Sequence, residues 1–121
     1  MATLLVNTGK AIVTNRLQGS GTAPQYVAYG TGTGTTSATD TTLFTETGTR
    51  VSGTQSQVTT SVTNDTYQVV GTQTAGGTLA ITNAGLFDAS TSGNLFAKGD
   101  FSTINLSTGD SIQFTFKVQF S

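Results

Sequence analysis

The sequence predicts an all-β fold, or a mostly β fold with one short N-terminal helix, arranged as an antiparallel β-sandwich or barrel-like module. Threonine, whose branched side chain suits a pleated sheet and restricts a helix, is abundant along the 121 residues. Clusters of Gly, Asn, Asp and Ser separate short apolar runs, as turns between strands do. Near the C-terminus apolar residues alternate with polar ones, at Ile112, Phe114, Phe116, Val118 and Phe120.

A single β-rich domain is expected over residues 1–121, in which residues 1–24 form an N-terminal arm or a short helix and loop. The helix is predicted for residues 7–18, with Asn7 or Thr8 as its cap and Gly19 as its end. A loop that holds the only proline follows it. The apolar residues near helical spacing are Ala11, Ile12, Val13 and Leu17.

The strands follow from apolar runs bounded by turn-forming residues. A hairpin is predicted around Asn64 and Asp65, which tolerate left-handed backbone. Residues 88–93 join a second antiparallel pair, and a turn at residues 107–110 leads into the last strand. The strands are expected at residues 25–29, 55–63, 66–75, 78–87, 94–101 and 111–120, with short ones around Leu43 and Phe44 and around Val51.

A stretch of Gly and Thr at residues 30–41 contains no large apolar side chain that could hold it against a core. We therefore expect a long exposed loop, and such loops in compact domains are usually functional or mobile. Two interpretations stay open, a contact surface for a partner and a flexible surface excursion. The residues predicted to bind a partner are Gly30, Thr31, Gly32, Thr33, Gly34, Thr35 and Thr36.

No cofactor or metal site is expected. Gly30, Gly32 and Gly34 precede a Thr-rich loop, whereas a dinucleotide fingerprint needs a helix there and a P-loop needs a Lys. Cys and His, the ligands of soft metals, are absent from the sequence. The sequence also has no Asp-x-Asp spacing, the pattern that would favour a calcium site.

The composition also argues against an enzyme. General acid-base catalysis near neutral pH relies on His or on carboxylates with shifted pKa values, and the chain has no His. Two carboxylates could form a glycosidase pair, but most lie in or beside predicted turns, where Asp caps backbone N–H groups. We assign no catalytic residue. The turn carboxylates are Asp40, Asp65, Asp88 and Asp110.

Charge and hydropathy argue against nucleic acid and membrane as partners. The net charge is −1, so the chain offers no basic field to a phosphate backbone. The apolar run at residues 4–6 is far shorter than a membrane span. So few charges favour a protein that ends up in an assembly. We interpret the five scattered cations as solvated surface groups: Lys10, Arg16, Arg50, Lys98 and Lys117.

Four phrases carry a resemblance to a known class of proteins: Tyr26–Gly32, Thr39–Leu43, Ile81–Asp88 and Gly109–Ser111. At these phrases the chain resembles small structural proteins of tailed bacteriophages, of the head decoration or cement type. Related sequences are labelled tail fibre proteins. The resemblance implies a β-sandwich or barrel-like module seated on a capsid lattice, with no enzymatic residue to carry over. Asn83 stands where many such sequences are expected to have an acidic residue.

This resemblance implies a virion structural protein that decorates or cements the capsid by binding between subunits of the major capsid protein. Its location would be the outer capsid surface, after synthesis in the host cytoplasm. A homo-oligomer is expected, and binding positions at the local threefold axes of a capsid shell suggest a trimer. The alternative is a tail fibre or receptor-binding module that binds carbohydrate, for which Tyr26, Tyr29 and Asp40 are the candidate residues.

Overall fold

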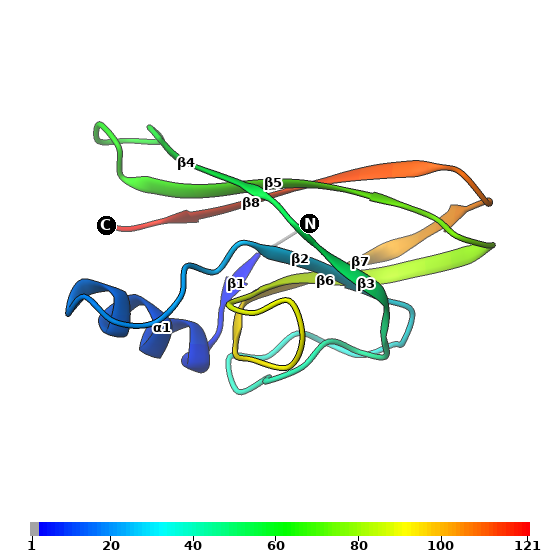
Figure 1. Ribbon diagram of the computed structural model, residues 1–121, viewed down its shortest axis with the longest axis horizontal. Helices are drawn as coiled ribbons and strands as arrows, with labels where there is room; N and C mark the ends of the chain where they lie inside the picture. The colour runs from blue at the N-terminus through cyan, green and yellow to red at the C-terminus, as the bar shows by residue number, and fades with distance from the viewer. Residues whose placement is uncertain (1–2) are drawn as a thin grey trace.

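Two antiparallel sheets pack face to face, with a short helix beside them (Figure 1). The computed structural model describes residues 3–121. The elements are β1 (Leu4–Leu5), α1 (Asn7–Leu17), β2 (Tyr26–Gly30), β3 (Glu46–Ser52), β4 (Thr54–Val58), β5 (Thr66–Thr74), β6 (Leu79–Phe87), β7 (Leu95–Leu106) and β8 (Ser111–Gln119). The larger sheet has the strand order β1-β7-β6-β2-β3 and the smaller sheet the order β4-β5-β8. This architecture confirms the mostly β, sandwich-like fold.

The two sheets share a corner at Gly53. β3 continues into β4 through this one residue, whose backbone N–H donates to the carbonyl of Gln25 at 2.7 Å. A Cβ at Gly53 would lie 2.6 Å from the side chain of Val69, so the close approach of the strands requires glycine. On the opposite side, β1 and β8 are the outer strands of their sheets. The two sheets are therefore joined where β3 continues into β4, whereas the strands at their other edges, β1 and β8, do not pair with each other.

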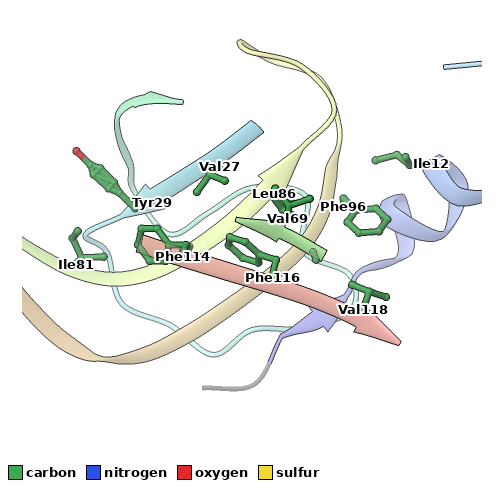
Figure 2. Close-up of a cluster of buried hydrophobic side chains, with 12 residues drawn as sticks. Ile12, Val27, Tyr29, Val69, Ile81, Leu86, Phe96, Phe114, Phe116 and Val118 are labelled. Carbon is green, nitrogen blue, oxygen red and sulfur yellow. The ribbon is translucent and has the colours of Figure 1, made fainter. Parts of the chain in front are cut away.

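The main core lies between the sheets and takes one face of β8. Phe114, Phe116 and Val118 are buried and point toward the larger sheet (Figure 2), as the alternation predicts. Phe120 follows the last residue of β8 and is 45% exposed, so the alternation fails at that position. The buried residues of this core are Ile12, Val27, Tyr29, Val69, Ile81, Ala84, Leu86, Phe96, Ala97, Phe114, Phe116 and Val118.

The predicted helix is confirmed, but its predicted cap is wrong. α1 begins after Val6, which is extended and makes no side-chain capping bond. The Thr8 hydroxyl instead donates to the carbonyl of Leu95 in β7 at 2.6 Å, because the helix lies against that strand. Gly19 has a φ of 91° and ends the helical segment, as predicted.

The short strand predicted around Leu43 and Phe44 is wrong. Phe44 and Thr45 form a turn before β3, and Leu43 precedes this turn in irregular backbone. Leu43 is buried in a second apolar cluster. Its tertiary contacts therefore override its strand propensity. The short strand around Val51 is confirmed as part of β3, whereas β1 was not predicted and β7 runs beyond its predicted end. The second cluster comprises Val6, Ala28, Leu43, Phe87 and Leu95.

The hairpin between β4 and β5 is confirmed, with a longer turn than Asn64 and Asp65 alone. Val58 pairs with Thr66, so residues 59–65 form the connection. Asn64 adopts left-handed backbone, with a φ of 59°. The Asp65 carboxylate accepts hydrogen bonds from three backbone N–H groups, those of Thr60, Ser61 and Val62, at 2.9, 3.0 and 2.9 Å. The bonds from Val62 and Thr60 contribute most to lowering the pKa of Asp65 well below its ordinary value.

Replacing Phe116 by Ala should lower the free energy of unfolding by about 3–5 kcal/mol, because the change leaves a cavity between the sheets. Phe120→Ala is the matched control. It removes the same ring from a side chain that is 45% exposed, and we expect it to cost less than about 1.5 kcal/mol. Urea unfolding followed by circular dichroism measures both. Equal losses would contradict the assignment of the inward face of β8.

Asp65 should make the hairpin sensitive to acid. Its folded-state pKa is lower than the unfolded value of 3.8. The stability it contributes is therefore present above that pH and lost as the pH falls through the folded-state pKa. Asp65→Asn should destabilise the protein at neutral pH, and its deficit relative to the wild type should shrink toward pH of about 2. Urea unfolding of both proteins across this range tests the prediction, and a deficit that is constant with pH would refute it.

Candidate partner-binding surface

Of the seven residues predicted to bind a partner, at positions 30–36, the structure exposes three. Gly30 is the last residue of β2 and is buried, so this structure does not expose it to a partner. Thr31, Gly32 and Thr36 are partly buried. The exposed ones are Thr33, Gly34 and Thr35, and farther along the loop Ser37, Thr39 and Thr41 are exposed as well. We call Thr33, Gly34 and Thr35 the loop tip.

The three glycines have a packing role that explains their spacing. The loop returns along Phe44 and Thr45: the N–H of Thr31 donates to the carbonyl of Thr45 at 3.1 Å, and that of Gly32 donates to the carbonyl of Phe44 at 2.9 Å. A Cβ on Gly32 would lie 2.6 Å from the Thr45 hydroxyl, and one on Gly34 would lie 2.7 Å from the Phe44 ring. Side chains at these positions would push the two segments apart. Because glycine and threonine alternate along this loop, the glycines pack against Phe44 and the threonines of the tip stay exposed.

A buried lysine holds this loop on the outer face of the larger sheet. The side chain of Lys98, in β7, is fully buried. Its Nζ donates to the carboxylate of Asp40 at 2.9 Å and to the carbonyl of Thr42 at 3.0 Å. The same nitrogen lies 3.3 Å from the centre of the Phe44 ring, a cation–π contact. The interpretation of Lys98 as a solvated surface charge is therefore wrong.

A β-bulge in β7 directs Lys98 outward. Leu86 of β6 pairs with Ala97, whereas the next residue, Phe87, pairs with Leu95, so Phe96 is an extra residue in β7. Phe96 and Ala97 consequently both join the core between the sheets. Lys98 then lies on the opposite face, where the loop covers it. A sequence signal for this burial exists, since Lys98 follows an uninterrupted apolar run.

Further polar contacts fix the loop along its length. The N–H of Thr36 donates to the carboxylate of Asp100 at 3.1 Å, and that of Asn7 donates to the carbonyl of Ala38 at 2.8 Å. The Asn83 side chain accepts from the N–H of Phe44 at 3.0 Å and donates to the carbonyl of Phe44 at 3.1 Å. An ionised acidic side chain could not make the second bond, which gives a physical reason for asparagine at position 83.

The loop's ion pair also determines the ionisation of Asp40. Partial burial would by itself raise the pKa of Asp40. The hydrogen bond from Lys98, the N–H of Ser37 and the Lys98 charge outweigh burial and lower the pKa below its ordinary value. Asp40 is thus a carboxylate near neutral pH and supplies the countercharge for the buried ammonium.

The other turn carboxylates behave as predicted. Asp88 accepts from the N–H of Asn94 at 2.7 Å, and Asp110 accepts from the N–H of Ser107 at 2.8 Å. Arg50, in contrast, differs from its predicted solvated state. It donates to the carbonyls of Ala89 and Ser92 at 2.9 and 2.6 Å, so it anchors the turn between β6 and β7.

The outer face of the smaller sheet is a second candidate contact surface. Its side chains alternate with those of the core, and hydroxyl and amide groups predominate. A single charged residue, Lys117, lies among them. The sequence identified this polar face only for the last strand. The residues that the pairing register places on this face are Thr54, Ser56, Val58, Thr66, Gln68, Val70, Thr72, Thr74, Ser111, Gln113, Thr115, Lys117 and Gln119.

The residues predicted to bind carbohydrate do not come together. Tyr29 is buried in the core between the sheets, whereas Tyr26 packs against the second cluster on the other face of the larger sheet. Asp40 is engaged by Lys98. A different hollow of about 470 Å³ lies between α1 and the turn that follows β6. Its lining is mixed, with polar Thr14, Asn15, Gln18, Asp88 and Asn94 beside apolar Ala11 and Ile12.

An apolar groove of about 320 Å³ runs between α1 and the ends of β5 and β8. Leu17 and Phe120 form its exposed rim. Tyr67 lines it, and burial raises the pKa of this phenol to about 12. The hydroxyl lies 2.9 Å from the carbonyl of Pro24, so Tyr67 holds the loop after α1 against the smaller sheet.

Within residues 3–121, no group of three or more acidic side chains is arranged to hold a metal ion. No helix in this part of the chain is long and apolar enough to cross a membrane. Comparison with protein-family models, with curated proteins and with solved structures found no match for the chain.

Asp40→Asn should destabilise the protein by about 2–4 kcal/mol, because the buried Lys98 ammonium would lose its countercharge. Adding Lys98→Met should recover part of the loss, since it removes the unpaired cation and retains an apolar chain of similar length. Glu46→Gln is the control, at an ion pair whose carboxylate is 30% exposed, and should cost less. Urea unfolding measures all variants. A double variant less stable than Asp40→Asn alone would contradict the proposed anchoring of the loop.

Proposed function

We propose that this chain is a non-enzymatic virion structural protein that decorates or cements a bacteriophage capsid. In this role it binds between subunits of the major capsid protein on the outer surface of the shell. The observation that carries the proposal is the exposed loop tip, held by the buried Lys98 on a rigid base. The resemblance of the four sequence phrases to phage structural proteins points to the same class.

The loop tip suits a repeated contact between proteins. Thr33 and Thr35 offer hydroxyl groups without charge, so docking them requires no desolvation of an ion. The glycine packing and the Lys98 anchor order the loop before binding, and this reduces the conformational entropy lost when a partner binds. Many such contacts, repeated by the symmetry of a shell, would favour the assembled state by mass action.

The outer face of the smaller sheet supports the same proposal. Its hydroxyl and amide groups can form hydrogen bonds with neighbouring subunits, and Lys117 is the one charge on it. A homo-oligomer would multiply these contacts. The trimer suggested by the threefold axes of a shell is an untested alternative to a twofold pairing of two copies.

A tail fibre or receptor-binding module is the second candidate. The hollow beside α1 favours it, since Thr14, Asn15 and Asp88 provide the hydroxyl, amide and carboxylate groups that bind sugar hydroxyls. The aromatic platform expected for that function does not form, because Tyr26 and Tyr29 lie on opposite faces of the sheet. We therefore favour the capsid role.

The capsid proposal predicts that the purified chain binds heads and not tails of the phage that encodes it. Thr33→Glu with Thr35→Glu should reduce binding at least about tenfold, because each bound loop tip would bury two new charges. Thr33→Ser with Thr35→Ser keeps the hydroxyls and serves as the control. Cosedimentation with separated heads and tails, followed by cryo-electron microscopy of decorated heads, measures the effect.

Three results would overturn the capsid assignment: density for the chain only in the tail, equal binding by the Glu variant, or absence of the chain from the particle. Binding to glycans that is lost on Asp88→Asn would favour the receptor-binding alternative.

A further inference from the structure

β8 is a long strand with one unpaired edge. Its nine residues pair with β5 from Ser111 to Gln119 without a shift of register. Within residues 3–121 no strand pairs with its other side. β1, the corresponding outer strand of the larger sheet, has only two residues. The edge of β8 is therefore the longer unpaired edge on the open side of the sandwich.

The backbone bonds at the two ends of β8 show which of its groups face this edge. The N–H of Phe120 donates to the carbonyl of Asp65 at 2.9 Å, and the N–H of Ala75 donates to the carbonyl of Asp110 at 2.7 Å. Both bonds involve even-numbered residues of the C-terminal segment, Asp110 and Phe120. The backbone N–H and C=O groups of the even-numbered residues of β8 therefore point toward β5. The residues whose N–H and C=O groups face the free edge are Ser111, Gln113, Thr115, Lys117 and Gln119.

This edge has few of the features that prevent strands from pairing. Natural edge strands are protected by prolines, bulges, several charges or a covering segment. β8 has no proline and no bulge against β5, and Lys117 is its one charged residue. Water can solvate its outward N–H and C=O groups, but another extended strand can pair with all of them at once.

We propose that β8 pairs antiparallel with β8 of a second copy of this chain, about a twofold axis at Thr115. In this register every outward-facing backbone group of the strand finds a partner. Lys117 lies opposite Gln113 of the other copy, so the two ammonium groups are separated. Thr115 lies opposite its own equivalent, a cross-strand pair that is favourable in sheets. The apolar residues also match, Ile112 with Val118 and Phe114 with Phe116.

The pairing joins two three-stranded sheets into one sheet of six strands. The contact is isologous, so it closes with two copies and does not propagate into a fibre. The polar outer faces of the two smaller sheets become continuous. The inference does not depend on the capsid proposal, because it rests on the hydrogen-bonding groups and register of β8 alone.

Sedimentation equilibrium of the full chain tests the proposal, with Thr115→Pro as the main variant. Proline removes one outward N–H and leaves the ladder to β5 intact, since Thr115 does not bond to β5. We expect the wild type to be a dimer and Thr115→Pro to raise the dissociation constant at least about tenfold. Thr115→Val keeps the N–H and should remain a dimer. Circular dichroism checks that each variant is folded.

A charge pair at the axis tests the register even if the proline variant fails to fold. Thr115→Lys and Thr115→Glu should each weaken self-association, because residue 115 would face its own charge. Mixing the two variants should restore a dimer, now a heterodimer. A wild type that is monomeric up to about 1 mM, a trimer, or no recovery on mixing would overturn the proposal. So would a monomeric wild type whose capsid binding is lost in Thr115→Pro, since the edge would then receive a capsid strand.

Discussion

The larger sheet must be covered on both faces by a chain with little apolar material, and Lys98 makes this possible. The smaller sheet covers one face with the aromatic core. The other face is covered by a loop whose large apolar side chains are only Leu43 and Phe44. A fully buried ammonium, bound to Asp40, a backbone carbonyl and an aromatic ring, supplies the remaining attachment. The order of the loop tip depends on this cluster.

The secondary-structure elements that depend on local sequence patterns could be predicted from the sequence alone. The period of two gave the inward face of β8, and the glycine at position 19 gave the end of α1. The two hairpins followed from short polar connections, because a turn constrains the strands on either side of it. The prediction failed where a strand ends, at Phe120, since alternation alone does not say where pairing stops.

The candidate surface could be predicted only in part, because it depends on contacts between distant segments. Lys98 meets a carboxylate 58 positions away, and it faces that carboxylate only because a bulge at Phe96 reverses the side-chain alternation. The glycines at 32 and 34 indicated an exposed loop, whereas their spacing reflects close packing against Phe44. Sequence periodicity contains neither the bulge nor the partner segment, so it could not distinguish a flexible excursion from an anchored loop.

The loop tip and the free edge of β8 lie on opposite sides of the sandwich, and this arrangement has a functional consequence. The loop after β2 covers the larger sheet, whereas β8 borders the smaller one (Figure 1). Pairing of β8 edges would therefore leave both loop tips free for another partner. A nine-residue edge that no strand of residues 3–121 covers, on a protein with a net charge of only −1, would otherwise favour nonspecific association. A closed twofold contact pairs the backbone groups of the β8 edge and gives each dimer two loop tips. Avidity can then compensate for weak individual contacts.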